Sequence, residues 1–104
     1  MDKKYSEMTE EELRNEIADL KVKAQKAEQM GMVNEYAVHE RKMSMAKAYM
    51  MDPSEFKAGE TYEIIDGEGD KFTISYKKGV FAWGSRNDSG KEEALPISLL
   101  GHKL

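Results

Sequence analysis

The sequence predicts an α+β fold, in which an N-terminal antiparallel helical hairpin precedes a small antiparallel β-barrel. Composition changes abruptly near Asp52 and Pro53: helix-forming Met, Ala, Glu and Lys dominate before this point, and seven of the eight glycines follow it. Apolar spacings of three and four characterise the first half, whereas the second half contains short β-rich runs between turn residues. We therefore expect a hairpin over 1–52 and a barrel over 53–104, packed together as one compact unit.

The first helix has recognisable start and stop signals. Thr9 and Glu12 have the spacing of a capping box, and Gly31 is a natural C′ residue. Between these signals, apolar residues recur at spacings of four and three and form one narrow seam. The seam consists of Leu13, Ile17, Leu20, Ala24 and Ala27.

A second helix is expected from near Met32 to about Met51, and the short connection requires it to fold back on the first. One arc of this helix can meet the first helix. It contains Met32, Tyr36, Met43 and Met50. Nearly opposite lies an apolar stripe formed by Val38, Met45 and Tyr49, which needs a different partner. That partner is either the strand region or a second copy of the chain.

The second half of the chain contains several strand signals. We expect strands at 61–65, 70–77, 80–85 and 92–95, with a short piece near the C-terminus. Pro96 ends the fourth strand, and the Ile-Ser-Leu-Leu run after it is expected to form a 3₁₀ turn. Closure into a barrel would remove the exposed strand edges.

The hairpin around Gly79 decides where the only tryptophan points. A two-residue turn at Lys78-Gly79 would place Tyr76 opposite Phe81 and Ile74 opposite Trp83, so all the bulky residues would face the core. A three-residue turn with a glycine bulge would instead turn Phe81 and Trp83 away from Ile74 and Tyr76. The hydrophobic pattern favours the first register, in which Trp83 is buried.

Composition argues against several classes of function. The net charge is −4, and neither half carries the surplus of positive charge that binds nucleic acid nonspecifically. Without cysteines the chain has no disulfides or thiol catalysis, and without a long apolar run no membrane span is expected. We expect a cytoplasmic protein.

No catalytic, metal or cofactor constellation is apparent. His39 and His102 are far apart in the chain and lack carboxylates at ligand spacing. The acidic run from Asp66 to Asp70 begins like a calcium-binding loop, but lysines replace the glycine and glutamate that such a loop needs later. We therefore expect a solvated turn there, and no enzymatic activity or cofactor.

Basic residues support an alternative function. Five of them could form a belt along the folded-back helices and contact phosphates: Lys21, Lys23, Lys26, Arg41 and Lys42. Acids early and bases late in the first helix also follow from ordinary helix-dipole patterning. Arg86, at the start of a polar loop, is placed to recognise an anionic or aromatic partner.

Several segments resemble one known family across almost the whole chain. They include KYSEMTEEEL, NEYAVHERKMSMAKAYM, FTISY, GVFAWG and EEALPISLL. In these segments the sequence is similar to the YfhH family of small proteins from Bacillus-type Gram-positive bacteria. The resemblance implies a helical hairpin joined to an SH3-like β-barrel, and it implies no activity or functional residues.

The sequence therefore predicts a non-enzymatic protein-interaction or regulatory module. We expect the stripe of Val38, Met45 and Tyr49, together with Arg86, to contact another protein or a second copy of the chain. The alternative is a nucleic-acid-binding regulator that uses the basic belt and the barrel loops.

Overall fold

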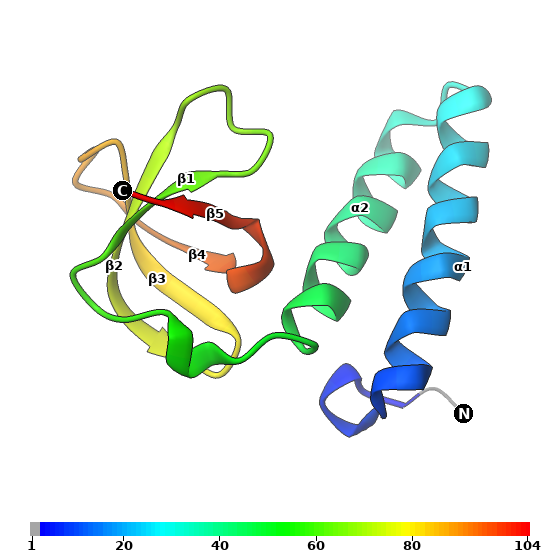
Figure 1. Ribbon diagram of the computed structural model, residues 1–104. Coiled ribbons are helices and arrows are strands. Elements are labelled where there is room, and N and C mark those ends of the chain that lie inside the picture. The colour runs from blue at the N-terminus through cyan, green and yellow to red at the C-terminus, as the bar shows by residue number, and fades with distance from the viewer. Residues whose placement is uncertain (1–2) are drawn as a thin grey trace. The chain divides into compact units, whose positions relative to one another are not determined.

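Two helices come first in the chain and five strands follow, as the computed structural model shows (Figure 1). The structure describes residues 3–104, and it confirms the α+β class. The chain divides into two units, of which the first ends at Met50 and the second begins at Met51. This boundary lies close to the predicted one, and the packing of the two parts as one compact unit stays a prediction.

Helix α1 spans Glu10–Gln29 and has the predicted caps. The Glu12 backbone N–H donates to Thr9 Oγ1 over 3.1 Å, and the Thr9 N–H donates to Glu12 Oε1 over 3.0 Å. This capping box satisfies two backbone donors that the first helical turn leaves unpaired. At the other end Gly31 has φ 70°, the left-handed geometry of a C′ residue.

Helix α2, Val33–Ala48, follows at once and runs back beside α1 (Figure 1). Leu20 and Ala24 of α1 pack with Met43 of α2, and Tyr36 is partly buried against them. Most of the predicted α1 seam is buried, although Ile17 is only half-buried. The predicted α2 arc is less buried, because Met32 and Met50 are each 37% exposed.

Five antiparallel strands form one sheet with the order β4-β3-β2-β1-β5. The short 3₁₀ turn Ile97–Leu99 precedes the last strand, as predicted. Strands β4 and β5 lie at the two edges of the sheet, so a closed barrel is not confirmed. The strands are β1 Thr61–Ile64, β2 Lys71–Lys78, β3 Phe81–Arg86, β4 Glu92–Pro96 and β5 Leu100–Lys103.

Neither hairpin register that the sequence suggested is the one observed. Lys78 pairs with Phe81, so the two turn residues are Gly79 and Val80. Gly79 has φ 61°, which suits the first central position of a tight hairpin turn. Farther along, Tyr76 pairs with Trp83 and Ile74 pairs with Gly84, which leaves Ser75 as an extra residue in β2. Such an extra residue is a β-bulge.

Gly84 is the residue that permits the bulge. A Cβ atom at this position would lie 1.9 Å from the Thr73 carbonyl oxygen and 3.1 Å from the Ile74 Cα. Both are backbone atoms of β2, so they cannot move aside as a flexible side chain would. The bulge reverses the alternation of β2, and Ile74 is buried while Tyr76 lies on the other face of the sheet.

The buried face of the sheet therefore differs from the predicted one. Phe72, Ile74 and Ala82 are almost completely buried, whereas Tyr76 is 45% exposed and Trp83 is half-buried. The expectation that all the bulky residues of this hairpin face the core is wrong. The buried apolar residues of this unit are Phe56, Tyr62, Ile64, Phe72, Ile74, Val80, Ala82, Leu95, Ile97 and Leu100.

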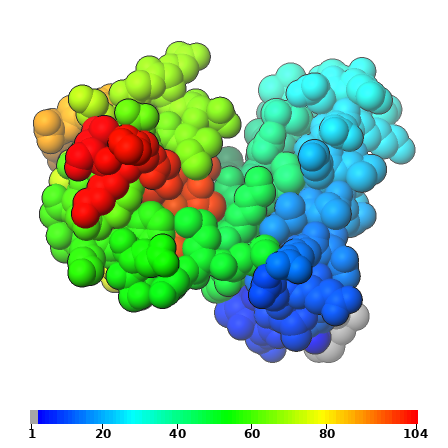
Figure 2. Space-filling model, viewed as in Figure 1, coloured from blue at the N-terminus to red at the C-terminus, as the bar shows by residue number. Residues whose placement is uncertain are grey.

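Glu60 joins three segments of the sheet unit. Its carboxylate accepts hydrogen bonds from the Tyr62 hydroxyl at 2.7 Å and the Lys57 backbone N–H at 2.8 Å, and it pairs with Lys103 Nζ at 2.6 Å. Figure 2 shows β5, in red, on the surface beside the green segment that leads into β1. These contacts, the Lys103 bond foremost, lower the pKa of Glu60 to about 2.

Replacing Gly84 with alanine should destabilise the sheet unit. The new Cβ would overlap the Thr73 carbonyl, and overpacking against backbone costs about 3 kcal/mol of unfolding free energy. Urea unfolding followed by circular dichroism measures this loss. Ser85→Ala, on the neighbouring residue of β3, should change the unfolding free energy by only about 0.5 kcal/mol. Equal stability of Gly84→Ala and wild type would show that the strands are paired differently.

Glu60 should contribute stability that is lost in acid. Because its pKa falls from 4.5 to about 2 on folding, the contribution is complete above pH 4.5 and disappears as the pH drops toward 2. Urea midpoints of wild type and Glu60→Gln should therefore converge over this range. In a Lys103→Met background, the effect of Glu60→Gln on the midpoint should be smaller above pH 4.5. An effect of Glu60→Gln that does not depend on pH would contradict the assignment.

Candidate functional site

An aromatic pair lies on the exposed face of the sheet, opposite the buried face. Tyr76 of β2 and Trp83 of β3 are direct cross-strand partners. Their ring centroids are 5.9 Å apart and the ring planes differ by only 2°, so the rings are parallel and stacked. Parallel, offset rings are a favourable aromatic geometry, so the stacking holds both side chains in this orientation. We call Tyr76 and Trp83 the aromatic pair.

The residues around the aromatic pair give this face two different borders. On β4, Ala94 is the cross-strand partner of Trp83, and its small side chain leaves the indole uncovered on that side. One border is mixed, because Phe81 lies on the same face of β3 and its cross-strand partner on β2 is the exposed Lys78. The other border is polar: Thr73 pairs with Ser85, and Ser85 pairs with Glu92.

Glu92 is the acidic group nearest to the aromatic pair. The Tyr76 hydroxyl donates to Glu92 Oε1 over 3.5 Å, a long hydrogen bond that crosses the intervening strand β3. Partial desolvation raises the pKa of Tyr76, and the charge and hydrogen bond of Glu92 raise it further. At neutral pH this face therefore presents two neutral rings, the Glu92 carboxylate and, beside Phe81, the exposed ammonium group of Lys78.

The groups on this face are of kinds that bind ligands. Ring faces stack on planar groups and attract cations, and an adjacent carboxylate adds a second attraction for a positive charge. Among the described residues of this face, no hydrogen bond joins a nucleophilic side chain to a base that could activate it. Within residues 3–104, no group of three His, Asp or Glu side chains could hold a metal ion. In the same range, no helix has the length and apolar character needed to cross a membrane.

Arg86 donates three hydrogen bonds within the protein, although its side chain is still 36% exposed. Its Nε and Nη2 donate to the two carboxylate oxygens of Glu93 over 3.2 and 3.0 Å, and its Nη1 donates to Asp70 over 3.1 Å. These bonds, those to Glu93 foremost, raise the pKa of Arg86. A guanidinium held this way fastens β3 to β4 and to the loop before β2. Its predicted role in recognising an anionic or aromatic partner stays a prediction.

The predicted stripe on α2 is partly covered by the segment that precedes α1. Tyr5, in a 3₁₀ turn of that segment, places its ring edge-on against Tyr49 at 6.5 Å between centroids. Met45 and Tyr49 are half-buried, and only Val38 is clearly exposed, at 42%. Part of the stripe therefore has a partner within its own unit, other than the two that the sequence suggested.

The five basic residues do not form one belt. Lys23 and Lys42 line a single pocket of the helical unit, and Lys26 lines an adjoining one with Lys23. Lys21 lines a different hollow, together with Ile17 and Tyr36. Lys21 and Lys23 are two residues apart, which places them on opposite sides of α1. Arg41 is exposed and lines none of these pockets.

The exposure of the aromatic pair can be measured through the only tryptophan. Trp83 should show red-shifted fluorescence and quenching by acrylamide, because its ring is half-exposed. Tyr76→Ala should increase the quenching constant, since it removes the stacked ring from one side of the indole. Tyr36→Ala, in the helical unit, serves as a control that should leave the quenching unchanged. A blue-shifted emission that acrylamide does not quench would return Trp83 to the core.

Comparison with known proteins agrees with the resemblance seen in the sequence. The family model described as "Protein of unknown function (DUF1811)" matches residues 3–101. The chain is also 58% identical over 104 residues to the Bacillus subtilis (strain 168) protein described as "Uncharacterized protein YfhH", and the match covers 99% of both chains. Because both matches cover nearly the whole chain, the chain belongs to the YfhH (DUF1811) family.

Proposed function

We propose that this chain is a non-enzymatic, cytoplasmic interaction module that binds a segment of another protein on the aromatic pair. The observation that supports this most directly is that Tyr76, 45% exposed, stacks on the half-buried Trp83 on the face of the sheet opposite the buried one. Exposed stacked aromatic rings are characteristic of binding surfaces, because they supply contact area at low cost in conformational entropy.

The chemistry of this face favours a segment that carries lysine or arginine. A cation placed over Trp83 or Tyr76 gains about 0.5–1 kcal/mol from the ring face at an exposed site. Glu92 borders the same pair and offers a carboxylate to that cation. Residues 52–104 carry a net charge of −3, from seven basic and ten acidic residues, which attracts a basic segment and repels nucleic acid. Binding to another protein is thus favoured over the nucleic-acid alternative.

The finer fold assignment belongs to the same proposal. We take the sheet to be an SH3-like barrel in which β5 returns to pair with β1 after a 3₁₀ turn. Two features support it: the meander of β1 to β4, and the pairing of β5 with β1 at the far side of the sheet. Barrels of this size present binding residues on their strands and loops while the scaffold stays rigid.

A peptide library tests the proposal while the partner is still unidentified. Selection of phage-displayed 12-residue peptides on the full chain should enrich sequences containing lysine or arginine. Purified peptides should bind Tyr76→Ala at least about tenfold more weakly, which equals the loss of about 1.4 kcal/mol. Glu92→Gln should weaken basic peptides and leave neutral analogues of the same peptides unaffected.

Control variants separate this face from the others. Tyr49→Ala removes a half-buried tyrosine from the α2 stripe and should leave peptide binding unchanged. Loss of binding in Tyr49→Ala but not in Tyr76→Ala would move the site to the helices and overturn the proposal. Three other results would overturn it as well. One is the enrichment of acidic peptides, and another is salt-sensitive retention on a DNA oligonucleotide that depends on Tyr76. The last is a dimer of the chain that Tyr76→Ala dissociates.

A further inference from the structure

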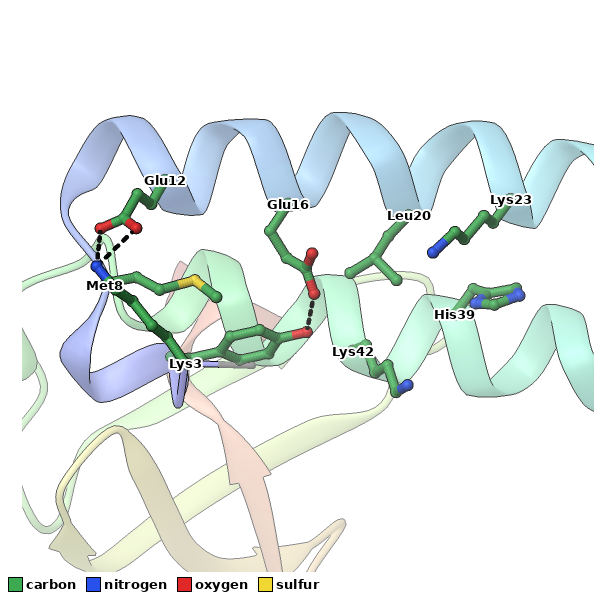
Figure 3. A pocket seen from close by; sticks show the side chains of 9 residues that line it. Lys3, Met8, Glu12, Glu16, Leu20, Lys23, His39 and Lys42 are labelled. Atoms are coloured by element: carbon green, nitrogen blue, oxygen red, sulfur yellow. Dashed lines mark hydrogen bonds and ion pairs between the residues drawn. The ribbon is translucent and has the colours of Figure 1, made fainter. Parts of the chain in front are cut away.

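The helical unit contains a pocket of about 600 Å³ between α1, α2 and the N-terminal segment (Figure 3). This volume lies within the range of small-molecule sites. Figure 3 shows two ends of different character: Glu12 and Lys3 lie at one end, and Lys23 and His39 at the other. The pocket is lined by Lys3, Tyr5, Met8, Glu12, Glu16, Leu20, Lys23, His39 and Lys42.

The acidic groups of the pocket are already satisfied by neighbours. Glu12 is ion-paired with Lys3 at 2.9 Å and accepts from the Thr9 N–H, and these bonds, that of Thr9 foremost, lower its pKa. Glu16 accepts a hydrogen bond of 2.8 Å from the Tyr5 hydroxyl. Burial, and then this bond, raise the pKa of Tyr5 to about 12, so the phenol stays protonated as the donor.

The basic groups at the other end are not satisfied in this way. His39 Nδ1 is buried and has no hydrogen-bond partner in the part of the chain that the structure describes. Lys42 Nζ takes part in none of the ion pairs found within residues 3–104. Lys23 pairs at 3.1 Å with Asp19, but both side chains are more than half exposed, so this pair is weak.

A second hollow of about 330 Å³ continues the basic end and shares Lys23 and His39 with the first. It adds Lys26, and its one carboxylate is that of Glu35. The imidazole of His39 therefore lies where two hollows meet, and four lysines line the combined space: Lys3, Lys23, Lys26 and Lys42. A buried polar atom without a partner destabilises the protein, and a ligand group that reaches it and bonds to it recovers this free energy.

We propose that this basic end binds the phosphate group of a small phosphorylated molecule through His39, Lys23 and Lys42. A phosphate monoester carries close to two negative charges at neutral pH and offers three acceptor oxygens, which suits several donors that line one pocket from two helices. Leu20 and Met8 line the same pocket and offer apolar contact to the remainder of the ligand. This site is on the helical unit and does not depend on the function proposed for the aromatic pair.

The arrangement favours a small molecule over the phosphate backbone of a nucleic acid. A nucleic acid contacts cations spread along an open surface, where every lysine and arginine contributes. Here Lys23, His39 and Lys42 line one hollow, while Lys21 and Arg41 do not line it. These two residues therefore serve as matched controls, each close in sequence to a residue of the site.

The test uses inorganic phosphate as the probe on the full chain, at constant ionic strength adjusted with sodium chloride. Nuclear magnetic resonance should show saturable shifts of the His39 ring nitrogens and of nearby amides in α1 and α2. Lys42→Ala, Lys23→Ala and His39→Phe should each weaken phosphate binding at least about tenfold, because each removes a bond to a charged group. Arg41→Ala and Lys21→Ala remove the same charge and should change the affinity less than about twofold.

Three results would overturn the proposal. The first is an absence of saturable shifts with phosphate, which would mean that the basic end of the pocket holds no phosphate group. The second is an equal loss of affinity in Arg41→Ala and Lys42→Ala, which would indicate general charge attraction. The third is tight binding of a DNA oligonucleotide that Lys21→Ala and Arg41→Ala weaken as much as Lys42→Ala does. Circular dichroism of His39→Phe confirms its fold, and the two lysine variants carry the test if it unfolds.

Discussion

The close approach of two backbones at Gly84 is the constraint on which the sheet unit depends. With only a hydrogen in place of a Cβ, β3 can lie against the Thr73 carbonyl, and β2 can hold Ser75 as an extra residue. The extra residue reverses which side chains face the core. Ile74 is then buried and Tyr76 is exposed, although the two are only two positions apart in one strand. Both the core and the candidate binding face thus follow from one missing side chain.

Charged groups in this protein fall into two classes with different consequences. Arg86, Glu60 and Glu12 are each held by several partners, and they fasten strands, loops and the N-terminal segment in place. Lys42, His39 and Glu92 are not held by comparable networks. The groups of the first class stabilise the local geometry of each unit. The groups of the second class are available to a ligand or a partner protein.

Tyr5 has a larger role than its position near the N-terminus indicates. Its ring contacts Tyr49 of α2, and its hydroxyl bonds to Glu16 of α1, so one side chain joins the 3₁₀ turn to both helices. The same ring covers part of the apolar stripe and forms a wall of the basic pocket. Part of the α2 stripe, which the sequence suggested was exposed, therefore lines a hollow together with Tyr5.

Local signals in the sequence determined the elements of this fold. The capping box of Thr9 and Glu12, the left-handed Gly31 and the 3₁₀ turn after Pro96 each depend on residues within one turn of chain, and the structure confirms all three. The β-rich runs were likewise sufficient to locate four strands and a short fifth one. Family membership also followed from the sequence, since it requires only the order of residues.

The register of the hairpin and the candidate sites were decided by tertiary structure. A glycine with positive φ suits a tight turn as either of its central residues, so the chain near Gly79 does not by itself choose between registers. One signal in the sequence could have indicated the observed register: glycine is favoured at the first central position of a type II′ turn, which is where Gly79 lies. Other features depend on contacts between separate elements. Gly84 of β3 lies against the Thr73 backbone of β2, and Arg86 bonds to Asp70 and Glu93. The burial of His39 Nδ1 without a hydrogen-bond partner likewise depends on how the helices pack. Only the pairing of strands and helices brings those atoms together, so no local pattern could reveal them.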